Sequence, residues 1–189
     1  RSTLFPYTTL FRSERWPNEY QVAAILHPNI WNVHGAWQVR AWLASCIDKG
    51  LLLIPPEEGW RATLVAADLI VGDYGSVTRY GAALGIPVWL TALPEQDLRA
   101  ASTADQLRLR APRLRLDGEL IDQIRTTAHD RSWQDGLLQQ ITSRPGQAGT
   151  ILRQTMYRLL DLPEPARAAP VSPVPLPQPI TGPTWIRHE

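Results

Sequence analysis

The sequence predicts an α/β fold, a Rossmann-like parallel sheet with flanking helices. Short apolar runs alternate with segments of helical periodicity from residue 22 to residue 91. Each run is continuously apolar rather than alternating, which is typical of strands covered on both faces. Runs of this kind, separated by helices, are typical of βαβ units around a parallel sheet.

The first predicted unit is a strand, a helix and a second strand. The run VAAILHP (22–28) ends at a proline, and the residue before a proline favours extended geometry. Apolar residues at helical spacing follow over 35–50, and Gly50 is the expected helix stop. The run LLLIPP (51–56) predicts a second buried strand, again ended by proline.

Two further strands complete the predicted sheet. A short helix is expected over 59–68, and the run LIVGD (69–73) predicts the third strand. The segment SVTRYGAALG (76–85) predicts a helix that ends at a glycine. The run IPVWLT (86–91) predicts the fourth strand.

Beyond residue 92 the pattern changes. The alternating Leu and Arg of 107–116 predict an exposed helix followed by an edge strand, and a stripe that binds a polyanion is the alternative. Amphipathic helices are expected over 117–130 and 147–162. The apolar face of the second helix consists of Ile151, Leu152, Met156, Leu159 and Leu160.

The two ends of the chain differ from its middle. Residues 1–13, RSTLFPYTTLFRS, contain no Met and resemble a translated sequencing adapter, so they are set aside as an artefact. We expect residues 14–162 to form one α/β domain, the C-terminal part of a longer protein. Residues 163–189 are rich in proline and are expected to form a disordered or extended tail.

Composition excludes several classes of function. The formal net charge is +1, so no general attraction to nucleic acid or anionic lipid is expected. The single cysteine, Cys46, excludes an internal disulfide and a cysteine metal site, and its apolar helical segment predicts a small buried side chain. No apolar run approaches the ~18 residues of a membrane span, so we expect a cytoplasmic protein. We also expect no metal or other cofactor.

The turn between strand 69–73 and helix 76–85 predicts a site for an anion, most naturally a phosphate. A helix that starts at the end of a parallel strand directs unbonded N–H groups and a partial positive charge at the ligand crevice of an α/β sheet. Gly75 lacks a Cβ that would keep a ligand away, Ser76 adds a hydroxyl, and Asp73 is expected to orient the turn. A helix N-cap formed by Ser76 is the alternative.

Two histidines follow the first strand. If the strands are parallel, His27 lies at the same sheet edge as Asp73 and Ser76. An imidazole there would donate to a phosphate oxygen or stabilise a leaving diphosphate, and a purely structural hydrogen bond is the alternative. His34 is a weaker candidate of the same kind.

The loop after the second strand, PPEEGW (55–60), offers groups for a nucleoside. Glu57 has a carboxylate for a ribose or base, and Trp60 has a flat indole. A solvated loop with a buried Trp is the alternative.

Three segments together, AILHPN, LLLIPP and LVAADLIVGDYGSVTRYGAALGIPVWL, resemble the C-terminal nucleotide-binding half of the CDP-glycerol glycerophosphotransferase family over residues 21–92. Proteins of that family have the two-domain GT-B fold. Their pattern here is a strand ending in His-Pro, an apolar strand, and a segment containing Asp-Tyr-Ser-Ser-Val. The segment DYGSV, residues 73–77, is similar to that motif.

The resemblance implies a nucleotide-binding role for residues 14–162. The diphosphate of CDP-glycerol, or of a related nucleotide-sugar, would lie against the helix that begins at Ser76 and Val77, near His27, and the cytidine would reach Glu57. The acceptor would be a cell-envelope polymer or its lipid-linked primer, at the inner face of the membrane. The resemblance also implies an N-terminal domain that carries part of the acceptor site and the general base.

Two positions depart from the family pattern. Tyr80 stands where the family has an acidic residue, and Gly75 replaces the first serine of the motif. The anion site is therefore retained better than the sugar or glycerol contacts. A non-catalytic or degenerate nucleotide-binding module is the alternative function.

Overall fold

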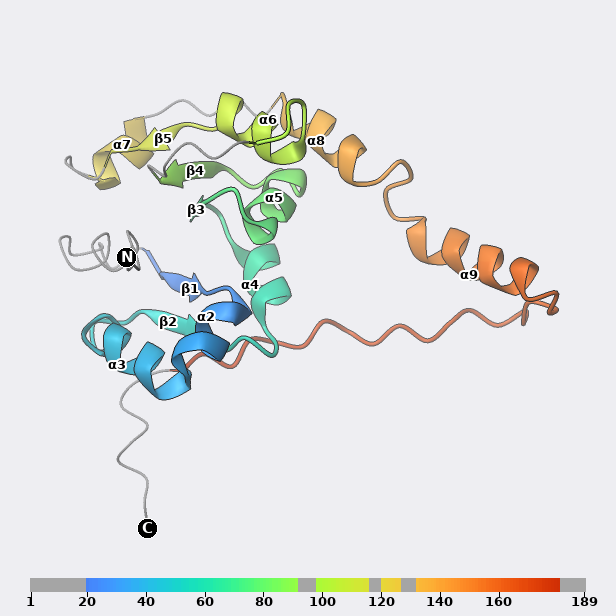
Figure 1. Cartoon of the computed structure of the whole chain (residues 1–189), viewed down its shortest axis with the longest axis horizontal. Helices are drawn as coiled ribbons and strands as arrows, with labels where there is room; N and C mark the ends of the chain where they lie inside the picture. Colours follow the sequence, from blue (N-terminus) through green and yellow to red (C-terminus); the bar gives the residue numbers. More distant parts are fainter. Residues whose placement is uncertain (1–19, 92–97, 116–119, 127–131, 181–189) are drawn as a thin grey trace, which may run out of the picture.

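The computed structural model describes residues 20–91, 98–115, 120–126 and 132–180 (Figure 1). It is an α/β fold with small parallel sheets flanked by helices, which confirms the predicted class at that level. The elements are β1 (Ala23–Ile25), α2 (Pro28–His34), α3 (Ala36–Ile47), β2 (Leu52–Ile54), α4 (Trp60–Ala66), β3 (Ile70–Gly72), α5 (Ser76–Ala83), β4 (Val88–Thr91), α6 (Thr103–Arg110), β5 (Arg113–Leu114), α7 (Leu120–Thr126), α8 (Gln134–Ile141) and α9 (Ala148–Leu159).

The strands form two parallel sheets. In the first sheet, β1 pairs with β2, with Ala24 opposite Leu53. In the second, β4 lies between β3 and β5, with Gly72 opposite Leu90. The two strands of each parallel pair are connected in sequence by at least one helix, as parallel pairing requires.

A continuous Rossmann-like sheet is not confirmed. Among the described strands, no ladder joins β1 or β2 to β3, β4 or β5. In Figure 1, β1 and β2 run toward α2 and α4, whereas β3 starts beside α4 and runs the opposite way. The β1–β2 unit and the β3–β5 unit therefore contain two separate sheets, and the strands within each sheet are parallel.

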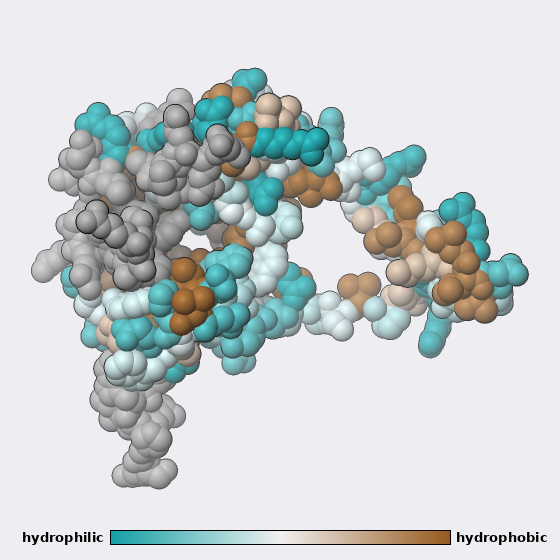
Figure 2. Space-filling view, viewed as in Figure 1, coloured by the Kyte–Doolittle hydropathy of each residue, from teal (hydrophilic) through white to brown (hydrophobic). Residues whose placement is uncertain are grey.

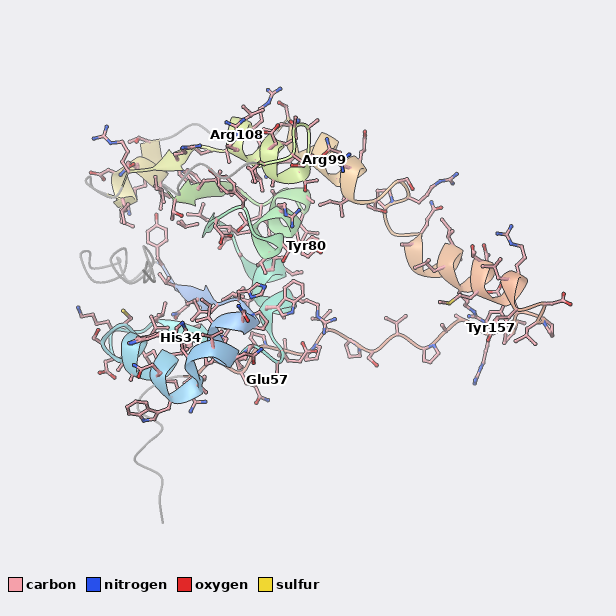
Figure 3. All side chains as sticks on the ribbon, in the orientation of Figure 1. His34, Glu57, Tyr80, Arg99, Arg108 and Tyr157 are labelled. Atoms are coloured by element: carbon pink, nitrogen blue, oxygen red, sulfur yellow. The ribbon has the colours of Figure 1, made fainter. Side chains whose placement is uncertain are left out.

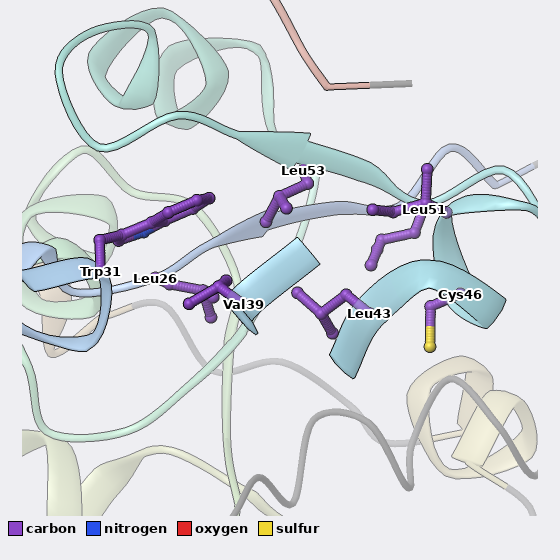
Figure 4. Packing of buried hydrophobic residues seen from close by; sticks show 8 residues of the cluster. Leu26, Trp31, Val39, Leu43, Cys46, Leu51 and Leu53 are labelled. Atoms are coloured by element: carbon purple, nitrogen blue, oxygen red, sulfur yellow. The ribbon is translucent and has the colours of Figure 1, made fainter. Parts of the chain in front are cut away.

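The β1–β2 unit has its own core, made where α2 and α3 cover the sheet (Figure 4). Cys46 is a free, buried thiol in this core, as predicted. The cluster consists of Leu26, Trp31, Val39, Leu43, Cys46, Ile47, Leu51 and Leu53. Helix α2 was not predicted, although Pro28 at its first position is a common helix start.

The β3–β5 unit is covered by α5, α6 and α8. Its main cluster consists of Ala82, Val88, Leu90, Leu107, Ala111 and Leu137. Helix α8 was not predicted, and it supplies Leu137 to this cluster. It also supplies Gln134, whose buried Nε2 donates to the Ile86 carbonyl over 2.8 Å and so holds α8 to the segment just before β4.

The segments beyond residue 92 partly match the expectations. The alternating segment 107–116 ends α6 and contains β5, which is an edge strand as predicted. The helix starts earlier than expected, at Thr103, and is not wholly exposed, because Leu107 is fully buried. The amphipathic helix expected near the C-terminus is present as α9, but none of its residues is buried. After α9 the chain extends past Pro177 to Ile180, which forms an antiparallel bridge with Leu53 of β2.

Residues 1–13, set aside as an artefact, and 181–189 of the tail lie outside the described residues. No helix in the described ranges is both long enough and apolar enough to cross a bilayer.

Two glycines should respond to alanine with opposite signs. Gly85 follows α5 with φ +80°, and Gly136 lies inside α8, and a Cβ at either would meet open space. Gly85→Ala should lower the free energy of unfolding by about 1 kcal/mol through the left-handed backbone. Gly136→Ala should raise it by about 0.5–1 kcal/mol through helix propensity. Urea unfolding of both variants measures this, and losses of equal size would contradict these helix boundaries.

Asp105 should make stability depend on acid pH. Its Oδ1 accepts from Arg108 Nη2 over 2.8 Å, and its Oδ2 accepts from the Ala101 N–H over 3.0 Å. The hydrogen bonds from Arg108 and then from Ala101 hold the pKa of this carboxyl below its ordinary value of 3.8. A carboxyl with a lowered pKa stabilises the fold at pH values above its ordinary pKa. This contribution is lost as the pH falls through the folded-state pKa.

The stability difference between the wild type and Asp105→Asn should therefore be full near pH 6 and shrink below about pH 4. Thermal unfolding across pH 2–6 measures it. A difference that stays constant over this range would show that Asp105 acts by packing alone.

Candidate functional site

The turn between β3 and α5 is built on a short hydrogen bond. Gly75 is the N-cap of α5, in extended geometry with φ −64° and ψ 168°. Its N–H donates to Asp73 Oδ1 over 2.6 Å, so Asp73 orients the turn as predicted. A Cβ at Gly75 would lie 2.6 Å from the same carboxylate oxygen. Glycine is therefore needed for the Asp73 contact as well as for an open approach to the helix end.

Ser76 opens α5 as predicted, and it is not the N-cap named as the alternative. Ser76 is the first residue of the helix, and Gly75 occupies the cap position without any side-chain hydrogen bond to the first turn. The first backbone bond of the helix runs from the Arg79 N–H to the Gly75 carbonyl over 3.2 Å. The N–H groups of Ser76, Val77 and Thr78 consequently have no acceptor within the helix.

An uncapped first turn by itself marks no site, because α3 and α4 also lack a side-chain cap. The difference lies in what surrounds the start of α5. This helix begins directly after the C-terminal end of a parallel strand, the edge where ligands of open α/β sheets bind.

The turn is held rigidly against the β3–β5 sheet. Thr91, fully buried at the end of β4, donates from Oγ1 to the Gly72 carbonyl over 3.3 Å. A Cβ at Gly72 would collide with the Thr78 hydroxyl, so the first turn of α5 is packed directly on the end of β3.

Two arginines lie close to the turn. Arg113 of β5 donates from Nη2 to the Tyr74 hydroxyl over 3.4 Å and is exposed. Arg79 of α5 donates from Nη1 to Thr103 Oγ1 over 3.1 Å, and this bond ties α5 to α6. Arg113 was not among the candidate residues expected from the sequence, although it belongs to the Leu and Arg alternation of 107–116. Its guanidinium makes the surroundings of the turn more positive.

The two histidines lie in the other unit. His27 caps α2, with Nδ1 accepting from the Asn29 N–H over 3.1 Å. This is the structural hydrogen bond named as its alternative role. The His34 ring packs edge-on against Trp42, with centroids 4.9 Å apart.

The expected sharing of one sheet edge by His27 and the turn depended on a single parallel sheet, which the described strands do not form. Figure 3 shows His34 in the β1–β2 unit and Tyr80 in the β3–β5 unit. No hydrogen bond or ion pair among the described residues joins His27 to Asp73 or Ser76.

Trp60 contacts a side chain of α5, whereas Glu57 is exposed to solvent. The rings of Trp60 and Tyr80 are stacked with centroids 6.4 Å apart and an interplanar angle of 27°. Tyr80 lies four residues after Ser76 and so shares its side of α5. Glu57 is exposed in the preceding loop.

The neighbouring Glu58 forms an ion pair with Arg61 over 2.6 Å, and the hydrogen bond from Arg61 lowers the pKa of that carboxyl. Arg61 also lies 6.0 Å from the centroid of the Trp60 ring. In the part of the chain that the structure describes, no three His, Cys, Asp or Glu side chains are grouped to hold a metal ion.

Comparisons with family models, with curated proteins and with solved structures gave no match for this chain.

The hydrogen bond inside the turn can be separated from the charge of Asp73. Asp73→Ala removes the acceptor of the Gly75 N–H and should lower the free energy of unfolding by about 1 kcal/mol. Asp73→Asn keeps a carbonyl acceptor and should cost less than half as much. Urea unfolding of both variants provides the comparison. Equal losses would show that charge, rather than the hydrogen bond, organises the turn.

Proposed function

We propose that this chain is the donor-nucleotide-binding part of a glycerophosphotransferase or glycosyltransferase that acts on cell-envelope polymer precursors. One observation carries the proposal: the uncapped first turn of α5 follows the end of β3 in a turn fixed by Asp73 and Thr91. The similarity of DYGSV, residues 73–77, to the family motif supports the choice of donor.

The chemistry of this turn favours a diphosphate. The N–H groups of Ser76, Val77 and Thr78 and the partial positive charge of the helix end favour a negative ligand. Arg113, beside Tyr74, adds a full positive charge. The carboxylate of Asp73 opposes an anion, but Oδ1 is engaged by the Gly75 N–H. Backbone donors fixed before the ligand arrives stabilise charge without reorganisation, as a leaving nucleotide requires.

The nucleoside would lie further along α5. The stacked rings of Trp60 and Tyr80 offer an apolar platform about one helical turn from the first N–H groups, a spacing of about 6 Å. The roles of His27 with a leaving diphosphate, and of Glu57 with a cytidine, rest on the family resemblance alone. Both would require the two units to approach each other over the donor.

The proposed reaction is a displacement in which an acceptor hydroxyl gives its proton to the general base and attacks the donor. With CDP-glycerol the oxygen attacks the phosphorus that carries glycerol and CMP leaves; with a nucleotide-sugar it attacks the anomeric carbon and the nucleoside diphosphate leaves. Such transfers depend on closure of two domains that position the reactants and exclude water. We assign donor binding to this chain, and the acceptor site and general base to a further domain. We expect the reaction to take place in the cytoplasm, at the inner membrane face, where a polymer or lipid-linked acceptor would lie.

A second candidate is a nucleotide-binding module without turnover. Tyr80 favours it, since this side chain stacks on Trp60 where the family has an acidic group. Transfer to a glycerol-phosphate or glycan acceptor by the protein together with its further domain would exclude this candidate.

The proposed site predicts a graded loss of nucleotide affinity. Ser76→Ala should weaken CDP or UDP by about fivefold through one lost hydrogen bond of about 1 kcal/mol. Arg113→Gln should weaken a diphosphate more than the nucleoside, because only the diphosphate carries charge. Isothermal titration calorimetry with CDP, UDP, GDP and cytidine measures both effects.

Matched controls lie away from the turn. Ser143, exposed between α8 and α9, and Arg110, exposed at the end of α6, should tolerate Ser143→Ala and Arg110→Gln without loss of affinity. If Ser76→Ala and Ser143→Ala lose affinity equally, the nucleotide binds elsewhere and the turn is only a helix start.

A further inference from the structure

The proline-rich tail returns to the domain after α9. In Figure 1 it runs from the end of α9 back toward α4 and β2, and Figure 2 shows part of it crossing to the sheets as a single line of residues. Residues 166–176 are exposed, whereas Pro177, Pro179 and Ile180 are partly buried. The tail therefore touches the β1–β2 unit through its last described residues.

The tail contacts the edge of β2 that faces away from β1. The Leu52 N–H donates to the Val22 carbonyl over 2.9 Å on the β1 side, so the next residue, Leu53, presents its carbonyl to the opposite side. There the Ile180 N–H donates to the Leu53 carbonyl over 2.8 Å in an antiparallel bridge. The Ile180 side chain packs against the core cluster of the β1–β2 unit. Extended peptides add to sheet edges by the same combination of backbone bonds and side-chain burial.

The two prolines suit this position. Successive N–H groups of an extended segment point to opposite sides, and the Ile180 N–H points at β2. Pro177 and Pro179 therefore occupy positions that face away from β2, where a missing N–H costs no hydrogen bond. A further strand would find no donors at these positions, so the tail closes the edge of the sheet.

Gly59 provides a second anchor for the tail. This residue is the N-cap of α4, with φ +98°. A Cβ at Gly59 would lie 2.9 Å from the Pro177 Cα, so the tail backbone packs directly on the glycine. The Gly59 carbonyl also accepts from the Thr63 N–H over 2.9 Å. The residue that the tail touches is therefore the one that starts α4.

We propose that the β2 edge and Gly59 form a docking site for the tail, and that the docked residues 177–180 hold Trp60 where it stacks on Tyr80. Trp60 directly follows Gly59, so a shift of Gly59 moves the indole. The link to nucleotide binding rests on the proposed function, in which these two rings hold the nucleoside. The docked tail then favours the nucleoside without touching the phosphates.

The docking is reversible, because the docked part is short and a long exposed span precedes it. Before this span, Arg153 of α9 bonds Glu164 over 3.1 Å and the Pro165 carbonyl over 2.8 Å. A segment held only near its ends opens locally while the rest of the domain stays folded. If the docked tail tightens nucleotide binding, the nucleotide must tighten docking in return.

Two matched glycine variants test the docking without a ligand. Gly59→Ala should displace Pro177 and speed hydrogen exchange of the Ile180 amide by about tenfold. Gly50→Ala places a side chain on an equally left-handed backbone, φ +100°, but its Cβ meets open space. Exchange at Ile180 should therefore stay as in the wild type. Equal acceleration by the two variants would show that backbone strain alone is responsible and would overturn the docking.

A second pair of variants tests whether the tail holds Trp60. Ile180→Asp places an unpaired charge against the core cluster and should release the tail, which shifts the Trp60 indole signal in a ¹H–¹⁵N spectrum. Val171→Asp, in the exposed span, should leave that signal in place. An indole signal that ignores Ile180→Asp would show that the tail does not position Trp60.

Calorimetric titration tests the link to the nucleotide. Ile180→Asp should weaken CDP by about fivefold and leave inorganic pyrophosphate unchanged, because pyrophosphate reaches only the start of α5. CDP, but not pyrophosphate, should slow exchange of the Ile180 amide. Equal losses for both ligands would show general destabilisation and would overturn the link. If the wild type binds neither ligand, the proposed function fails, and the exchange and indole measurements decide separately whether the tail holds Trp60.

Discussion

The close packing of α5 on β3 is the contact on which the rest of the β3–β5 unit depends. Two glycines make it possible, because a Cβ at Gly72 would collide with Thr78 and a Cβ at Gly81 would collide with Ile70. The helix therefore lies nearer the sheet than side chains would otherwise allow. This distance fixes where the first N–H groups of α5 lie relative to the end of β3.

The contacts around this packing determine what the turn can bind. Thr91 holds the Gly72 carbonyl, and Asp73 holds the Gly75 N–H, so both sides of the turn are anchored before any ligand arrives. The remaining donors belong to the first turn of α5 and to Arg113 of β5. Backbone donors that are already in place favour a charged, oxygen-rich ligand over a neutral one.

Local patterns predicted most of the elements between residues 22 and 91. Continuous apolar runs marked the strands, and Gly50 and Gly85, both with positive φ, marked helix ends. The division into two sheets was not predictable in this way. Whether β1 pairs with β3 depends on the path of the chain through α4, and no residue pattern within either strand records that path.

The site was predictable to a similar degree. The turn, its Asp73 hydrogen bond and the start of α5 followed from Gly and Asp placed between a strand and a helix. The approach of Arg113 to Tyr74 joins residues 39 positions apart, so only the folded sheet reveals it. The exposure of the apolar face of α9 was also not predictable from the sequence, because an amphipathic pattern predicts an apolar face but not what covers it.

In the proposed site, the backbone at the start of α5 receives the phosphates of a nucleotide. A ¹H–¹⁵N correlation spectrum recorded during titration with CDP, and separately with inorganic pyrophosphate, tests this most directly. The amide signals of Ser76, Val77 and Thr78 should shift most with both ligands, and the Trp60 indole signal should shift only with CDP. Unchanged signals at residues 76–78, with shifts confined to other parts of the chain, would contradict it.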